Sequence, residues 1–191
     1  MPYLLTLAWI LAIIYATIPP LWLLVHPFAE GWRATTTKIG PAKSIGLLWL
    51  AIMVITGIVT APWRYEVLYA TPWSWLGWGV LFIAGASLYS RIGHFGLDNL
   101  IGRTELESGR EQKLVTAGMH GRVRHPIYLA HLLMLTAWTL GTGLLVLYVL
   151  WVIAVITGFF MIRAEDTELE HRFGDEFREY KRRVPAILPL R

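Results

Sequence analysis

The residues that decide the fold are 126–162, PIYLAHLLMLTAWTLGTGLLVLYVLWVIAVITGFFMI. The stretch holds no Asp, Glu, Lys or Arg, and it is far longer than the about 20 apolar residues that cross a bilayer once. The sequence LGTG at 140–143 interrupts it near the middle, and its two glycines favour a turn. We therefore predict a tight hairpin of two membrane helices, the first of them short.

Three further apolar stretches precede this hairpin, at residues 3–25, 44–61 and 73–90. Together with the hairpin they predict an all-α polytopic membrane protein with five transmembrane helices. Pro19 and Pro20 should kink the first helix or end it early. Small residues in the third stretch should let a neighbouring helix approach closely. These small residues are Gly77, Gly79, Gly85 and Ala86.

The composition agrees with a membrane protein. Hydrophobic residues make up 55% of the chain and charged residues only 16%, whereas soluble domains are about 25% charged. The absence of cysteine excludes disulfides, thiolate metal sites and a cysteine nucleophile. The sequence has no metal-binding motif, and we expect no nucleic-acid partner.

The positive charges predict the orientation, because cytoplasmic loops of membrane proteins are enriched in Lys and Arg. If the N-terminus lies outside, segments 26–43 and 91–125 and the C-terminal tail are cytoplasmic. Arg64 is then the only one of the 17 Lys and Arg residues outside, and a different number of spans would destroy this asymmetry. We predict a protein of a prokaryotic cytoplasmic membrane, with its N-terminus outside and its C-terminus in the cytoplasm.

The C-terminal tail is predicted to form a cytoplasmic amphipathic helix. Its apolar residues recur every three or four positions and form one stripe, while the other faces are charged. The stripe consists of Leu169, Phe173, Phe177, Tyr180 and Val184. The helix would lie along the membrane interface or pack on segment 91–125, and Pro185 and Pro189 would end it.

Glu165 lies one helical turn before this stripe, where the last span leaves the bilayer. A carboxylate at the head of an apolar face is costly to bury unless it is paired or binds a ligand. Glu165 could therefore form a salt bridge to a loop arginine or contact a polar or cationic ligand. The adjacent Asp166 points about 100° away around the helix and would be solvated.

A second polar group stands at the start of the hairpin, in Arg124, His125, Pro126 and Tyr128. Proline suits the first turn of a helix, so His125 should lie near the N-cap beside unpaired backbone amides. Such a helix start can bind an anion, and Tyr128 adds an aromatic ring. Alternatively, Arg124 anchors the helix at the lipid headgroups and Tyr128 belongs to the interfacial aromatic belt.

His131 falls inside the fourth span, six residues after His125. Histidines that share a metal on one helix are spaced by four residues, so this pair does not predict a metal site. We expect His131 to be hydrogen-bonded inside the protein. The remaining histidines do not cluster in the sequence; they are His26, His94, His120 and His171.

Two motifs carry a family resemblance: LVTAGMHGRVRHPIY at 114–128 and RAEDTELEHRFGDEFREYKRRVPAILP at 163–189. They resemble the two motifs of the isoprenylcysteine carboxyl methyltransferase and phospholipid methyltransferase superfamily. The resemblance covers roughly residues 90–191. It implies a single integral membrane domain over 1–191, in which 1–90 supply three spans and 91–191 form the catalytic, cofactor-binding part.

The resemblance also implies S-adenosylmethionine as the methyl donor, in a cytosol-facing pocket closed by the tail. The residues matching the motifs, and so implied to bind this cofactor, are Arg124, His125, Pro126, Tyr128, Glu165, Asp166 and Leu169. Glu165 would face the donor's positive charges, and the 124–126 corner would face its carboxylate. Tyr128 or Phe173 would offer a flat surface to the adenine.

Three positions depart from the family pattern. Asp166 stands where the family has glutamate, and His120 where it often has an aromatic residue. The family also places an arginine one turn before the first acid, where this chain has Met161, with Arg163 as the nearest arginine. An arginine fork is the natural clamp for a carboxylate, so this shift weakens the case for a prenylcysteine carboxyl acceptor.

The function that the resemblance implies is S-adenosylmethionine-dependent methyl transfer to a lipophilic acceptor that enters from the bilayer. Arg163 could orient a carboxylate acceptor, whereas an amine or thiol must lose a proton, for which His131 and Glu165 are the candidate bases. The acceptor could be an isoprenylcysteine, a phospholipid or a small molecule. A sterol-type reductase with a nicotinamide cofactor and a non-enzymatic membrane subunit remain alternatives. Membrane lipid is an expected partner, and the sequence does not predict an oligomeric state.

Overall fold

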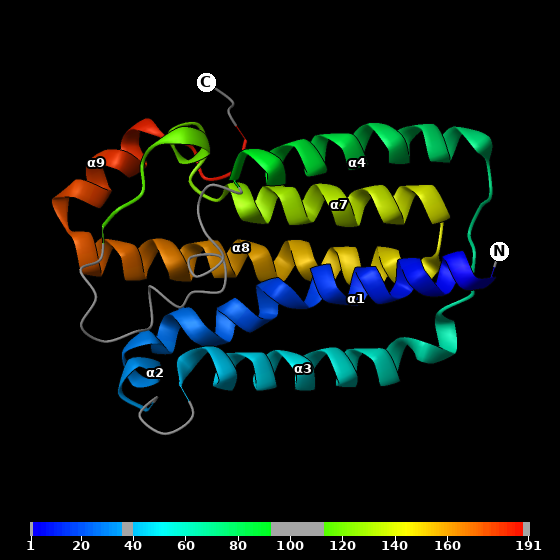
Figure 1. The fold of residues 1–191 in the computed structure, drawn as a ribbon, viewed down its shortest axis with the longest axis horizontal. Helices are drawn as coiled ribbons and strands as arrows, with labels where there is room; N and C mark the ends of the chain where they lie inside the picture. Colours follow the sequence, from blue (N-terminus) through cyan, green and yellow to red (C-terminus); the bar gives the residue numbers. More distant parts are fainter. Residues whose placement is uncertain (1, 36–39, 93–112, 189–191) are drawn as a thin grey trace.

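The computed structural model describes residues 2–35, 40–92 and 113–188, and this part of the chain is helical, with one isolated β-bridge. Figure 1 shows long helices running alongside one another. They are α1 (Pro2–Val25), α3 (Pro41–Thr60), α4 (Pro72–Ile92), α7 (Pro126–Thr142) and α8 (Leu145–Phe173). The all-α prediction is therefore confirmed, and the hairpin of α7 and α8 turns where the sequence LGTG predicts.

Three helical segments of the described chain are long and apolar enough to cross a membrane: Pro2–Trp32, Lys43–Trp63 and Leu145–Phe173. The count of five spans stays a prediction. It is supported by exposed Leu76, Val80 and Ile83 on α4, which are suited to contact lipid. Helix α7 has 17 residues, or roughly 26 Å of helix, and is as short as the sequence predicts.

Helices α1 and α7 lie at the centre of the bundle. Helix α1 packs against α3, α7 and α8, and α7 packs against α4 and α8. The contact between α4 and α7 is close at Gly85, where a Cβ atom would lie 3.0 Å from the sulfur of Met134. Gly85 therefore has the predicted packing role, whereas Gly77 and Gly79 face open space and the prediction is wrong for them.

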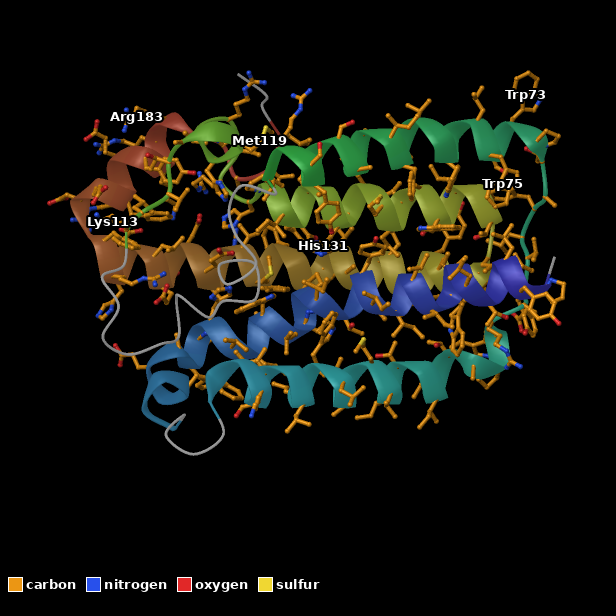
Figure 2. The ribbon with its side chains drawn as sticks, viewed as in Figure 1. Trp73, Trp75, Lys113, Met119, His131 and Arg183 are labelled. Atoms are coloured by element: carbon orange, nitrogen blue, oxygen red, sulfur yellow. The ribbon has the colours of Figure 1, made fainter. Side chains whose placement is uncertain are left out.

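The two ends of the bundle differ in chemistry. Figure 2 shows Trp73 and Trp75 at one end and Lys113 and Arg183 at the other, with His131 between them. The end near the N-terminus is closed by an antiparallel bridge between Val67 and Leu144. Three connecting elements lie near the other end: η1 (His26–Phe28), α2 (Ala29–Thr35) and η4 (Gly118–Gly121). We call the latter the polar end.

Two expectations about helix ends need correction. Pro19 and Pro20 lie inside α1, so of the two predicted effects the early end does not occur, and the kink stays a prediction. The tail is not one helix, because α8 ends at Phe173 and a separate α9 (Asp175–Arg183) follows. Gly174 between them has φ 57° and ψ −126°, a conformation open to glycine but not to residues with a side chain.

The tail stripe nevertheless packs as one apolar surface. Phe177, Tyr180 and Val184 pack together with Leu114, and Leu169 and Phe173 join them from the end of α8. The stripe therefore covers the end of the predicted segment 91–125, as expected. The residues of that segment up to 112, with Arg103, Arg110 and His94, lie outside the described residues, as do Lys38 and Arg191.

Candidate active site at the polar end

The side chain of His125 lies between two carboxylates. Its Nδ1 is 3.0 Å from Oε2 of Glu165, and its Nε2 is 3.1 Å from Oδ1 of Asp166. His125 is the N-cap residue of α7, as predicted, and Pro126 begins the helix. Carboxylate oxygens only accept hydrogen bonds, so both ring nitrogens carry a proton and the imidazole is a cation.

The pKa of His125 reflects this position. Burial alone would lower it, but the negative charges of Glu165 and Asp166 outweigh burial and raise the pKa to about 9. The cation therefore persists at neutral pH. It holds the two adjacent acids at the end of α8, which would otherwise repel each other.

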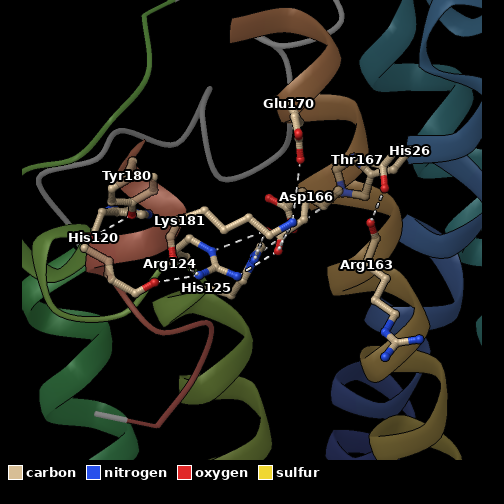
Figure 3. Close-up of polar contacts among 12 residues, drawn as sticks. His26, His120, Arg124, His125, Arg163, Asp166, Thr167, Glu170, Tyr180 and Lys181 are labelled. Atoms are coloured by element: carbon tan, nitrogen blue, oxygen red, sulfur yellow. Dashed lines mark hydrogen bonds and ion pairs between the residues drawn. The ribbon is translucent and has the colours of Figure 1, made fainter. Parts of the chain in front are cut away.

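Asp166 is buried, and the prediction that it is solvated is wrong. Arg124 binds it with Nε 3.3 Å from Oδ1 and Nη2 2.7 Å from Oδ2. Lys181 of α9 adds its ammonium at 3.5 Å from Oδ2. Both oxygens of Asp166 thus accept from protein groups, and Figure 3 shows the aspartate enclosed by its partners. Its side chain is 8% exposed. Because it is buried and bonded to protein groups, Asp166 holds its neighbours in position.

The tail after α9 crosses the start of α7. The backbone amides of Arg124 and His125 donate to the carbonyl oxygens of Pro185 and Ala186 at 2.9 and 3.0 Å. Nη1 of Arg124 also donates to the carbonyl oxygen of Val184 at 2.5 Å. The amides and the guanidinium that the sequence suggested for an anionic ligand are therefore bonded to the tail in this structure.

Glu165 is the acid of this cluster that can still accept hydrogen bonds from a ligand. Among the described residues both of its contacts use Oε2: Nδ1 of His125 at 3.0 Å and Nε2 of His26 at 3.9 Å. Its side chain is 27% exposed. Glu165 is thus paired, as the salt-bridge interpretation requires, but with a histidine, and Oε1 stays free to accept from a ligand.

Tyr128 fastens α7 to α8 rather than presenting an open ring. Its hydroxyl donates to the carbonyl oxygen of Ala154 at 3.0 Å, and its ring packs with Met161 and Ile162. The ring lies directly against Gly158, where a Cβ atom would overlap it. The predicted position of a family arginine, Met161, is therefore a buried apolar position in this chain.

Three predicted residues lie apart from the charged cluster. Arg163 is exposed and stacks on the ring of Phe159 at 4.2 Å, and Figure 3 shows its guanidinium directed away from His125. Leu169 packs on the tail. His131 lies within α7 and is treated below.

Two residues join the cluster without a sequence signal. His26 follows α1 and stacks on Trp22 with ring centroids 5.1 Å apart, and no other histidine is near it in the sequence to indicate a site. Lys181 was one cation among several in the tail. Nothing in a single sequence pairs position 26 with 165, because their proximity depends on the packing of α1 against α8.

The part of the chain that holds this cluster is also similar to known proteins. The sequence profile of the phospholipid methyltransferase family matches residues 48–176, from α3 to the start of α9. The chain belongs to this family. The predicted resemblance is thereby confirmed, and the chain is an integral membrane protein.

Curated relatives in this superfamily act on different acceptors. Over 62% of this chain it is 30% identical to methanethiol S-methyltransferase 1 of Bradyrhizobium diazoefficiens, covering 40% of that protein. Over 44% it is 33% identical to human protein-S-isoprenylcysteine O-methyltransferase, covering 30%. Over 82% it is 25% identical to methanethiol S-methyltransferase of Pseudomonas deceptionensis, covering 59%.

The chain thus covers less than two thirds of the length of each of these relatives. No solved structure matches the chain.

Proposed function

We propose that this chain is a membrane methyltransferase that uses S-adenosylmethionine and methylates a lipophilic acceptor reaching the site from the bilayer. Family membership supports methyl transfer over the reductase and the non-enzymatic subunit. The observation that carries the proposal is the carboxylate of Glu165, which the His125 cation holds in place and whose Oε1 has no partner in the described part of the chain. It lies where a bundle of apolar helices meets a charged end.

The residues present suit this donor. S-adenosylmethionine, when bound, supplies a methyl group already activated by a sulfonium. Its sulfonium and ammonium are cations, and Glu165 can accept from or attract either of them. Its carboxylate requires a cation, which Lys181 can provide because its side chain is 41% exposed and its ammonium lies beside Asp166. The other members of the cluster hold these two side chains in position.

Positioning is the main contribution expected from the protein. An activated donor needs an acceptor held in line and water excluded, and correct orientation of two reactants accounts for a large part of such catalysis. His125, Arg124 and Asp166 fix the ends of α7 and α8 relative to each other. The tail over residues 184–187 closes one side of the cluster, so it can separate the donor from bulk water.

Calorimetric titration of the purified full chain with S-adenosylmethionine tests the proposal. We expect the wild type to bind the donor and Glu165→Gln to bind it at least ten-fold more weakly, because the amide keeps the shape but loses the charge. Glu176→Gln is the matched control, since Glu176 is exposed on α9 away from the cluster, and it should bind normally. A folded wild type that shows no binding would refute the proposal.

A further inference from the structure

His131 has a defined protonation pattern inside the bundle. Its Nδ1 lies 2.8 Å from the carbonyl oxygen of Ile127, one turn earlier on α7. A carbonyl only accepts hydrogen bonds, so Nδ1 carries the proton. Among the described residues no carboxylate pairs with His131, and a lone cation would be costly at membrane depth. The ring is therefore neutral, and Nε2 has a free lone pair.

Two tyrosines from other helices enclose this ring. Tyr15 of α1 and Tyr89 of α4 meet His131 edge-on, with ring centroids 5.7 and 5.3 Å away. Three helices thus bring an imidazole and two phenols together in the apolar part of the bundle. Figure 2 shows His131 away from both ends of the bundle.

The polar atoms of this group have no hydrogen-bond partner among the described residues, apart from Nδ1 of His131. Two other tyrosines differ: the Tyr128 hydroxyl donates to the carbonyl oxygen of Ala154 and the Tyr69 hydroxyl to that of Leu140. A polar group at membrane depth without a partner costs free energy. The two hydroxyls and the lone pair belong to three residues whose rings pack together, and they are available to a ligand with a polar atom.

The distance to the charged cluster suits a second substrate. His131 follows His125 by six residues on α7, which corresponds to roughly 9 Å along the helix axis. The group thus lies deeper in the bundle than His125, the residue of the charged cluster at the start of the same helix. An acceptor that enters from lipid would meet it first with its reactive end directed to the polar end.

We propose that His131, Tyr15 and Tyr89 form the acceptor site, and that Nε2 of His131 takes the proton of an uncharged thiol as its sulfur is methylated. The inference rests on the proposed function, which supplies the donor. The S–H bond breaks and its proton passes to Nε2, while the sulfur's electron pair bonds to the methyl carbon. The bond from that carbon to the sulfonium breaks, and its electrons stay on the donor's sulfur. The products are a thioether, the spent donor and an imidazolium that then loses its proton to solvent.

A thiol fits this base better than the other acceptors. A carboxylate arrives ionised and needs no base, and Arg163 is not near the cluster to bind it. An ammonium would bring a net charge into an apolar site. A thiol enters neutral and is far more acidic than an alcohol, so a neutral imidazole can take its proton as the bond to the methyl carbon forms. The tyrosine hydroxyls can donate to the developing thiolate.

The test compares two thiols of different acidity, octanethiol and the more acidic thiophenol, on wild type and His131→Asn. The asparagine amide can still donate to Ile127 but offers no base. We expect the methylation rate of octanethiol to fall about 10²–10⁴-fold, and that of thiophenol far less, because thiophenol ionises without help. His171→Asn, an exposed histidine on α8, should leave both rates unchanged.

Two readouts separate this inference from the proposed function. Thiolate absorbance of octanethiol bound to donor-free protein should develop at lower pH in wild type than in His131→Asn. Calorimetry should show equal donor binding by the two proteins. Normal donor binding with equal losses for both thiols, or with no loss, would overturn the acceptor site and leave the proposed function standing. Absence of donor binding by wild type would overturn both.

Discussion

Arg124 and Asp166 are 42 residues apart in the sequence and form a two-point ion pair that joins the start of α7 to the C-terminal third of α8. The pair is buried on both sides, with side chains 9% and 8% exposed. His125 forms ion pairs with the same aspartate and with Glu165. One carboxylate therefore fixes the relative position of two helices, the tail and the acid proposed to meet the donor.

Asp166→Asn should destabilise the protein strongly. The change leaves the guanidinium of Arg124 and the cation of His125 buried without their counter-charge, and breaking a buried pair in this way costs about 3–5 kcal/mol. The measurement is the free energy of unfolding in mixed detergent micelles. Asp175→Asn is the control, because the Asp175–Arg178 pair is exposed, and it should have no measurable effect. Equal stability of the two variants would contradict the role assigned to Asp166.

The cation of His125 should make stability depend on alkaline pH. Its pKa is about 9 in the folded protein and about 6.5 when unfolded. The raised pKa stabilises the folded state fully below pH of about 6.5, and the contribution is lost as pH rises through about 9. Its size is about 3 kcal/mol.

The check is the free energy of unfolding between those two pH values for wild type and His125→Gln. The wild type should lose stability across the window, and the variant should follow a flatter curve from a lower starting value. His171→Gln should behave as wild type. Parallel curves for wild type and His125→Gln would show that the histidine does not titrate in this window.

Local sequence patterns predict much of this fold, because helix formation and lipid exposure are local properties. The charge-free stretch 126–162 with its central LGTG predicts the α7–α8 hairpin, and Pro126 predicts the start of α7. The tail stripe predicts which side chains pack together. Periodicity cannot show that Gly174 divides the tail, since the stripe continues across the bend from Phe173 to Phe177.

The sequence predicts several residues of the site but not which of them contact one another. The motifs identify Arg124, His125 and Glu165, whereas the angular argument for Asp166 gives its direction on α8 without saying what faces it there. The His125 ring contacts both acids because each of its two nitrogens faces one carboxylate. His26 depends on the packing of α1 against α8, which no spacing in one sequence encodes.

Gly174→Ala should destabilise the tail through backbone strain alone. A Cβ atom at position 174 would meet nothing within 4 Å, so no clash contributes. The φ of 57° with ψ of −126° is unfavourable for alanine by about 1–3 kcal/mol. The measurement is amide hydrogen exchange across α9, which should become faster.

Gly46→Ala provides the contrast for this prediction. Gly46 lies within helix α3 and also faces open space, so alanine there should be neutral or slightly stabilising. Unchanged exchange in α9 of Gly174→Ala would mean that the bend tolerates a side chain, against the conformation observed.

Gly158→Ala should be harmful because the added side chain would meet Tyr128. A Cβ atom at position 158 would overlap the hydroxyl and ring of Tyr128, and overpacking of this kind costs about 3 kcal/mol. In a Tyr128→Leu background the three nearest obstructing atoms are gone, so the same alanine should cost less. Gly77→Ala, where a Cβ atom meets nothing, should be tolerated in both backgrounds. Unfolding free energies of the four proteins in the Gly158–Tyr128 cycle measure the coupling, and additive effects would show that α7 and α8 do not meet through these two residues.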